Sequence, residues 1–438
     1  MVSDWPIVSL GDVAADITVG HVGPMASEYQ PTGIPFLRSQ DIKPYRLKLS
    51  GIAHISEVFH ARLQKSALKP GDVVIVRTGK PGTAAVIPES LPIANCSDLV
   101  IVRPGKQLDS RFLVYYVNSL GNSHVASHLV GAVQQHFNVG SARQFKIALP
   151  HIDEQHAIGS ALGNLDDKIA LNERMNDTLE TIGRAIFKSW FVDFDPVKRK
   201  AAGQQPAGLS LELAALFPKS FIDSSLGKIP AGWEVRPIGD VTRVVGGSTP
   251  RTEESSYWQH GTIGWATPKD LAPLTSPILL DTERNITEQG LAEISSGLLP
   301  RGSVLLSSRA PIGYLAVSEI PVAINQGFIG LVCERDLPNY FVLNWVLTNI
   351  EEIKSHANGT TFLEISKANF RPLRVAVPPQ PLLKEFIRIV DPLYGRMITN
   401  LRESAVLAQI RDDLLPKLIT GEIRVHGSIK SASGTRGE

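Results

Sequence analysis

The chain contains near its start the stretch Trp5-Pro6-Ile7-Val8-Ser9-Leu10-Gly11-Asp12-Val13. A second version is Trp233-Glu234-Val235-Arg236-Pro237-Ile238-Gly239-Asp240-Val241, whose residue numbers are higher by 228. Tryptophan, glycine, aspartate and valine stand at the same places in both stretches. A recurrence at this distance indicates that the chain is built from two copies of one fold.

Other matched segments keep nearly the same offset. The offset is 231 between Leu68-Lys69-Pro70-Gly71-Asp72-Val73 and Leu299-Pro300-Arg301-Gly302-Ser303-Val304. It returns to 228 between Ile147-Ala148-Leu149-Pro150 and Val375-Ala376-Val377-Pro378. An offset that increases slightly and then recovers is what loop insertions and deletions in a duplicated fold would produce.

Each repeat ends in a long helical pattern. Apolar residues recur at steps of three and four in 155–191 and in 381–415, at positions whose numbers differ by 228. This spacing is typical of a long helix that packs along another helix, and each helix would be roughly 55 Å long. Matched polar positions within the two stripes favour mutual pairing over two separate amphipathic helices. The predicted seam consists of Leu165, Ile169, Asn172, Asn176, Leu179, Leu393, Met397, Asn400, Ser404 and Leu407.

These patterns predict an α+β protein in which a long antiparallel two-helix coiled coil separates two globular α/β domains in tandem repeat. Strands are expected at 72–77, 99–102, 303–306 and 328–332, and helices at 111–119 and 340–349. The segment 195–232 is rich in Ala, Gly, Pro and Gln and is predicted to be a linker. The expected boundaries are 1–150 for the first domain, 151–194 for the central helix, 195–232 for the linker, 233–378 for the second domain, 379–415 for the distal helix and 416–438 for a C-terminal tail.

Composition excludes several classes of protein. The 438 residues are 43% hydrophobic with a net charge of +1, so each domain can bury a core. No apolar run is long enough to span a membrane, and the N-terminus lacks the pattern of a signal peptide, so a cytoplasmic location is expected. Two cysteines, Cys96 and Cys333, are too few for a disulfide framework or a cysteine-based zinc site. Residues 1–150 carry 14 Lys and Arg against 10 Asp and Glu, an excess that ordinary solvated surface also explains.

The sequence contains none of the common catalytic motifs. It has no phosphate-binding loop, no dinucleotide fingerprint, no HExxH or paired Cys/His spacing and no nucleophile elbow. The Asn-Pro-Pro-aromatic motif of amino-methyltransferases is missing, and Glu352-Ile353-Lys354 has the spacing of a nuclease motif without an upstream acidic partner. We therefore expect a chain without an active site, a metal or a cofactor of its own.

Polar turn tips follow the predicted strands in both domains. Arg and Lys can pair with guanine in the major groove, and Asn and Gln with adenine, although such residues also fill ordinary turns. The scaffold repeats while the tips differ, which suits the reading of two different short DNA sequences. The residues expected to contact DNA are Arg38, Gln40, Arg77, Lys80, Gln134, Gln135, Asn138, Lys269, Ser307, Ser308, Arg309, Gln326 and Lys367.

Several segments resemble the specificity subunit of type I restriction–modification enzymes, and the similarity extends over essentially the whole chain. The most telling are Phe187-Lys188-Ser189-Trp190-Phe191-Val192-Asp193-Phe194-Asp195-Pro196-Val197 and Leu414-Leu415-Pro416-Lys417-Leu418-Ile419-Thr420-Gly421-Glu422-Ile423. Ser308-Arg309-Ala310-Pro311-Ile312-Gly313 and Ile324-Asn325-Gln326-Gly327 also look like family segments. Arg77-Thr78-Gly79-Lys80-Pro81-Gly82 in the first repeat departs from the second repeat's version, so fewer residue roles can be transferred there.

The resemblance implies two target-recognition domains, each reading one half of a split, asymmetric site in double-stranded DNA. The helix pair would act as a ruler and would dock two modification (methyltransferase) subunits, through which restriction (motor and nuclease) subunits join. Those partners would use S-adenosylmethionine, Mg and ATP for adenine-N6 methylation and cleavage, and this chain would be non-catalytic. Two alternatives stay open: a stand-alone bivalent sequence-specific DNA-binding protein, and a catalytic methyltransferase or nuclease.

Overall fold

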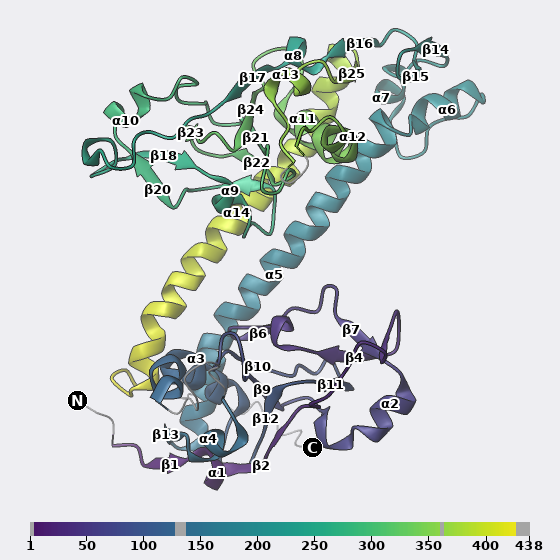
Figure 1. Cartoon of the computed structure of the whole chain (residues 1–438). Coiled ribbons are helices and arrows are strands. Elements are labelled where there is room, and N and C mark those ends of the chain that lie inside the picture. Colours follow the sequence, from purple (N-terminus) through teal and green to yellow (C-terminus); the bar gives the residue numbers. More distant parts are fainter. Residues whose placement is uncertain (1–3, 128–136, 360–362, 426–438) are drawn as a thin grey trace, which may run out of the picture. The chain divides into compact units, whose positions relative to one another are not determined.

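The computed structural model describes residues 4–127, 137–359 and 363–425, and the chain divides into two compact units. The first unit combines the chain up to Ala170 with the chain from Glu403 onward, and the second comprises Leu171–Arg402. Each unit therefore contains one globular part and one stretch of each long helix (Figure 1).

The globular part of the first unit contains a four-stranded sheet with the order β10-β9-β12-β2 and a five-stranded sheet with the order β3-β7-β4-β11-β8. The pairs β1–β13 and β5–β6 complete it. Its strands are β1 (Ile7–Ser9), β2 (Ala14–Val19), β3 (Tyr29–Gln30), β4 (Ile34–Leu37), β5 (Ile42–Lys43), β6 (Arg46–Leu47), β7 (Ala53–Ile55), β8 (Ala67–Leu68), β9 (Val73–Val76), β10 (Ala84–Val86), β11 (Ala94–Cys96), β12 (Leu99–Pro104) and β13 (Lys146–Ala148). Its short helices are α1 (Leu10–Val13), η1 (Ser39–Asp41), α2 (Glu57–Arg62), η2 (Gln64–Ser66), α3 (Ser110–Ser127) and α4 (Val139–Gln144).

The globular part of the second unit contains a five-stranded sheet with the order β17-β24-β21-β22-β19 and a three-stranded sheet with the order β20-β18-β23. Its strands are β14 (Phe221–Ser224), β15 (Gly227–Pro230), β16 (Glu234–Pro237), β17 (Arg243–Gly246), β18 (Ile263–Ala266), β19 (Ile278–Leu279), β20 (Arg284–Ile286), β21 (Val304–Ser307), β22 (Leu315–Ser318), β23 (Val322–Ile324), β24 (Phe328–Val332) and β25 (Arg374–Val377). Its short helices are α6 (Asp195–Ala201), α7 (Leu211–Ala215), α8 (Ile238–Val241), η3 (Ser255–Tyr257), α9 (Pro268–Leu271), α10 (Glu288–Ala292), α11 (Asn339–Thr348), α12 (Ile350–Ser355) and α13 (Lys367–Phe370).

The strand pairing shows that the two units share one fold. Ile7 on β1 lies opposite Ala148 on β13, and Val235 on β16 lies opposite Ala376 on β25, so the numbers of both partners increase by 228. A parallel pair, β4 with β11, joins distant segments in the first unit, and β18 with β23 does the same in the second. The predicted strands and short helices are confirmed by the observed elements. The continuous apolar runs β9 and β24 are buried over their whole length.

The two long helices are α5 (Ile152–Phe191) and α14 (Gln380–Ile419), each of 40 residues, and they run antiparallel (Figure 1). The numbers of their first and last residues also differ by 228. The predicted fold class is thus confirmed: an α+β tandem repeat with two globular α/β parts and a long antiparallel helix pair.

Polar contacts join the helices in both units. In the first unit an ion pair of 3.3 Å links Lys168 to Glu403. In the second, Asn400 Nδ2 donates to Asn176 Oδ1 over 2.8 Å, and Asn172 Nδ2 donates to the carbonyl oxygen of Asn400 over 3.4 Å. Among the predicted seam residues, Asn172, Asn176, Met397 and Asn400 are buried, and Leu165, Ile169, Leu179, Leu393, Ser404 and Leu407 are half-buried. The seam therefore has a polar centre, which restricts the helices to one register.

Replacing Asn400 with leucine is expected to lower the free energy of unfolding by about 1–3 kcal/mol, because the amide oxygen of buried Asn176 loses its donor. The double variant Asn176→Leu/Asn400→Leu should recover much of this loss, since neither polar group then remains buried. Chemical denaturation measures both, with Thr399→Leu on the exposed neighbouring position as the matched control. Equal unfolding free energies for Asn400→Leu and the control would contradict a role for this hydrogen bond.

The core of each unit includes residues from its helix stretches. In the first unit Leu415, Leu418 and Ile419 at the end of α14 belong to the same buried cluster as Trp5 and Leu10. In the second unit the aromatic side chains of Phe187 and Phe191 on α5 contact Phe341 of α11. Each globular part is thus fixed to both helices by apolar packing.

The segment predicted as a linker, 195–232, is folded. It forms α6, α7 and the hairpin β14–β15, and its Val197, Phe217 and Ile229 are buried in the core of the second unit. The ammonium group of Lys200, part of the basic run, donates to the carbonyl oxygens of Ala214 and Phe217. The linker prediction was wrong because it rested on composition, and the few apolar residues that dock the segment are outnumbered by small and polar ones.

None of the helices in the described part of the chain is both long and apolar enough to cross a membrane.

Candidate nucleic-acid interface

In the second unit, turns from three strand ends meet at one place. The backbone N–H of Asn325, after β23, donates to the carbonyl oxygen of Ala266 at the end of β18 over 3.0 Å. The N–H of Ser248, after β17, donates to the carbonyl oxygen of Ile324 over 3.1 Å. The parallel pairing of β18 with β23 places these ends side by side, because parallel strands end at the same edge.

Two further segments join this group. The N–H of Ser308, after β21, donates to the carbonyl oxygen of Gly327 over 2.8 Å. The N–H of Ile365 then donates to the carbonyl oxygen of Ser308 over 3.0 Å. Backbone hydrogen bonds thus bring together tips that lie far apart in the sequence, from Ser248 to Ile365.

The side chains on these turns are polar and largely accessible. Thr249 donates its hydroxyl proton to Gln326 Oε1, and Arg309 forms an ion pair of 3.6 Å with Glu364. Thr249, Lys269, Gln326 and Lys367 are exposed, and Arg309 is partly exposed. We name this set the second tip surface: Thr249, Lys269, Arg309, Gln326 and Lys367.

The structure places Ser307 and Ser308 beneath this surface, in contrast to the sequence prediction. Ser307 is fully buried, and its hydroxyl donates to the carbonyl oxygen of Pro311 over 2.7 Å. The same oxygen accepts from the N–H groups of Gly313 at 3.1 Å and Tyr314 at 2.8 Å. Since this fills the hydrogen-bonding capacity of a hydroxyl, Ser307 shapes the turn that carries Arg309.

The first unit repeats this framework with different side chains. The N–H of Ser97, after β11, donates to the carbonyl oxygen of Leu37 at 3.0 Å, and the N–H of Phe137 donates to that of Arg77 at 3.0 Å. The N–H of Asp98 donates to the carbonyl oxygen of His21 at 3.2 Å. We name this set the first tip surface: His21, Arg38, Gln40, Arg77, Lys80 and Asp98.

An ion pair dominates the first tip surface. Arg77 Nη1 lies 2.6 Å from Asp98 Oδ1, and the Thr78 hydroxyl donates to Asp98 Oδ2 over 3.2 Å. Lys80 is exposed on the same turn. Asp98 was missed by the sequence reasoning; its left-handed backbone, with φ of 53°, holds the carboxylate under the Arg77 turn.

Three other predicted residues have mixed outcomes. Gln40 is exposed, whereas Arg38 pairs with Asp41 over 3.1 Å in a capping arrangement at the start of η1. Hydrogen bonding to Asp41 raises the pKa of the Arg38 guanidinium. Asn138 caps α4 by accepting the N–H of Ser141 over 2.9 Å. Gln134 and Gln135 lie outside the described residues.

The two tip surfaces present different chemistry on matched backbones. Asp98 and Gln326 occupy equivalent places, because each follows the residue whose N–H bonds to the end of the neighbouring parallel strand. The first surface has a carboxylate there, paired with an arginine, and the second has an amide paired with a hydroxyl. Arg, Lys and Gln side chains on such turns can donate to guanine, phosphate or adenine.

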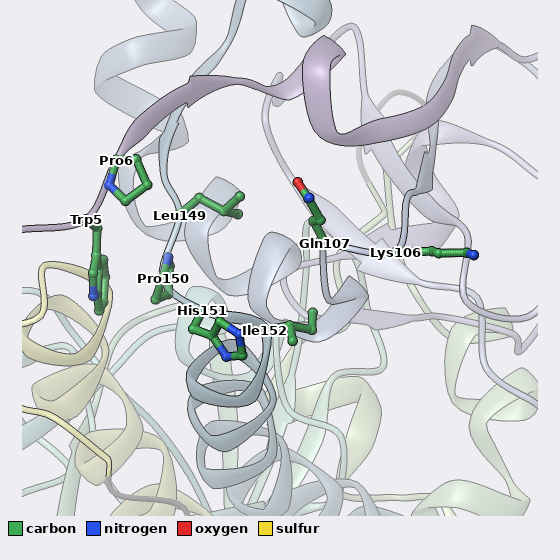
Figure 2. A pocket seen from close by; sticks show the side chains of 8 residues that line it. All are labelled: Trp5, Pro6, Lys106, Gln107, Leu149, Pro150, His151 and Ile152. Atoms are coloured by element: carbon green, nitrogen blue, oxygen red, sulfur yellow. The ribbon is translucent and has the colours of Figure 1, made fainter.

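A hollow of about 400 Å³ lies elsewhere in the first unit, near the start of α5 (Figure 2). It is lined by Trp5, Pro6, Lys106, Gln107, Leu149, Pro150, His151 and Ile152, none of which belongs to the first tip surface. Over 4–127, 137–359 and 363–425, no group of three or more His, Cys, Asp or Glu side chains is placed to hold a metal ion.

The chain is similar over most of its length to proteins of one family. The family model described as the type I restriction modification DNA specificity domain matches residues 2–181 and again 230–408. The type I restriction enzyme MjaIX specificity subunit of Methanocaldococcus jannaschii is 25% identical, over 96% of this chain and 94% of the relative. The HindI specificity subunit of Haemophilus influenzae is 23% identical, over 96% of this chain and 100% of the relative.

A solved structure shares the fold. It is the type I restriction–modification system S subunit from M. genitalium, which aligns with a TM-score of 0.58 and 16% identity over 95% of this chain and 96% of that one. Because the family model covers most of both repeats, the chain belongs to the family of type I restriction–modification specificity subunits.

Proposed function

We propose that the chain reads a bipartite, asymmetric DNA site, with one half recognised by each tip surface. The observation that carries this proposal is the repeated backbone framework, which presents Asp98 and Arg77 in one unit and Gln326 and Arg309 in the other. Two copies of one scaffold with unlike side chains suit two unlike half-sites, since base edges are distinguished by the donors and acceptors that meet them. Exposed lysines such as Lys80 and Lys269 would add contacts to phosphate.

The proposal extends to the partners. The paired helices would dock two methyltransferase subunits, and restriction subunits would join through them. In this arrangement the chain is non-catalytic and binds no cofactor, while its partners use S-adenosylmethionine, Mg and ATP. Co-purification tests it: we expect two methyltransferase subunits per chain, whereas a chain that binds its DNA site tightly with no partner would support a stand-alone DNA-binding protein.

Tip variants are expected to change one half-site at a time. Arg309→Ala or Lys269→Ala should alter the second half of the methylated motif, and Arg77→Ala or Lys80→Ala the first. Loss of a paired base contact costs about 1–3 kcal/mol, which is roughly 5- to 150-fold in discrimination at that base.

Methylation-sensitive sequencing of cells that express each variant with its partner subunits measures the motif directly. Lys219→Ala, which removes an exposed lysine outside both tip surfaces, is the matched control. Unchanged motifs in all four variants, or equal loss of methylation at every sequence, would contradict the division of the site between the two surfaces.

A further inference from the structure

In the first unit, a polar cluster connects the globular part to both long helices. Asp166 on α5 accepts a hydrogen bond from the hydroxyl of Tyr115 on α3, which lies against α5 (Figure 1). Arg411 on α14 donates to the other carboxylate oxygen of Asp166 over 2.6 Å. The Arg411 guanidinium also lies 4.8 Å from the ring centre of Tyr45, which stacks on Tyr115 at 4.9 Å.

This cluster is largely shielded from water. The side chains of Arg411 and Asp166 are only 15% and 20% exposed. Such a pair is strongly directional, and removal of either partner leaves the other charge poorly solvated. The cluster therefore restricts how α3 and the loop of Tyr45 can sit on the two helices.

The second unit has different chemistry at the matching positions. With the repeat offset of 228, Tyr394 takes the place of Asp166, and Gly183 takes the place of Arg411. The Tyr394 ring stacks on Tyr340 of α11 at 3.9 Å, and its hydroxyl pairs with Asn344 at 3.2 Å. Gly183 lies beside this ring, and a Cβ there would be in ordinary van der Waals contact with it at 3.6 Å. The globular part of the first unit thus contacts the helices at an ion pair, and that of the second unit through aromatic stacking.

We infer that Asp166, Arg411 and Tyr115 are positioning residues that fix the first tip surface on the helix pair, and so restrict the DNA spacer accepted between the half-sites. This inference rests on the proposed function. The residues contact no base in this scheme: they act by holding the reading surface in one orientation. Their loss should leave the half-site sequences unchanged and broaden the range of spacer lengths.

The test uses the full methyltransferase complex on a plasmid library in which both half-sites are constant and the spacer varies in length. With Asp166→Ala, methylation at spacers one base pair shorter or longer should rise at least about fivefold relative to the native spacer, and with Tyr115→Phe it should rise less. The matched control is Lys168→Met, which removes an ion pair between the same two helices. It should keep the wild-type spacer profile.

Each outcome decides the question. If Asp166→Ala folds and keeps the wild-type spacer profile, with or without a loss of thermal stability, the cluster does not fix the tip surface and the inference is wrong. If Asp166→Ala does not fold, the profile of Tyr115→Phe alone decides in the same way. A wild-type complex without a bipartite motif would overturn the proposed function itself, which is a separate result.

Discussion

One heptad inserted into α5, together with one inserted into the opposed stretch of α14, should lengthen the required DNA spacer by about three base pairs. Seven residues add about 10.5 Å to a helix, and base pairs rise about 3.4 Å each. The heptad keeps the stripe of apolar residues in phase, so the helices still pair. Sites with the original spacer then hold the two half-sites about 10 Å too close together for both tip surfaces to bind at once.

Methylation at the original spacer should fall at least about 100-fold, since loss of a half-site's base contacts costs several kcal/mol. The half-site sequences should stay the same, because neither tip surface is altered. A heptad inserted into α5 alone is the control. It displaces Asn176 from Asn400 and should disrupt the pairing of α5 with α14. Methylation of the original spacing by the doubly extended chain would show that the helices do not set the spacer.

Substitution of Gly247 by alanine should strongly disrupt the second unit's tips. A Cβ at this position would lie 1.8 Å from the carbonyl oxygen of Ile324 and 2.5 Å from that of Asn325. Backbone atoms cannot yield as a flexible side chain does, so the turn that holds Ser248 and Asn325 together must open. We expect the second unit to be destabilised by about 3 kcal/mol and recognition of the second half-site to be lost.

Chemical denaturation and methylation sequencing measure these two effects. Gly395→Ala is the matched control, because Gly395 lies inside α14 and a Cβ there would meet no other heavy atom of the described residues within 4 Å, apart from its chain neighbours and the adjacent helix backbone. That variant should gain about 0.5–1 kcal/mol of stability from helix propensity. Equal behaviour of the two alanine variants would mean that the close approach at Gly247 has no consequence.

The sequence predicted the repeat and the helix pair well because both are periodic signals. The offset of 228 that relates Trp5 to Trp233 also relates the ends of α5 and α14. The sequence could not reveal which turns lie next to one another. Their proximity depends on the pairing of β18 with β23, two strands that are distant along the chain. Ser307 illustrates the limit: its residue type suits DNA phosphate, but its hydroxyl is directed into its own turn.

Asp98, in contrast, lies on the first tip surface but was not predicted from the sequence. Nothing in the sequence around it distinguishes its carboxylate from that of an ordinary turn, and only the contact with Arg77 reveals its place. The segment 195–232 was predicted as a linker because small and polar residues outnumber its anchors. Phe217 and Ile229 are buried all the same, since a few well-placed apolar side chains are enough to dock a short segment.

The burial of Leu415, Leu418 and Ile419 beside Trp5 has a consequence for biosynthesis. The earliest-made part of the chain lacks a piece of its hydrophobic core until the ribosome has added the last turns of α14, long after Trp5 has left the exit tunnel. The second unit, which is continuous from Leu171 to Arg402, can close first. During translation we therefore expect the N-terminal half to keep apolar surface exposed until α14 is complete, which favours aggregation of the nascent protein.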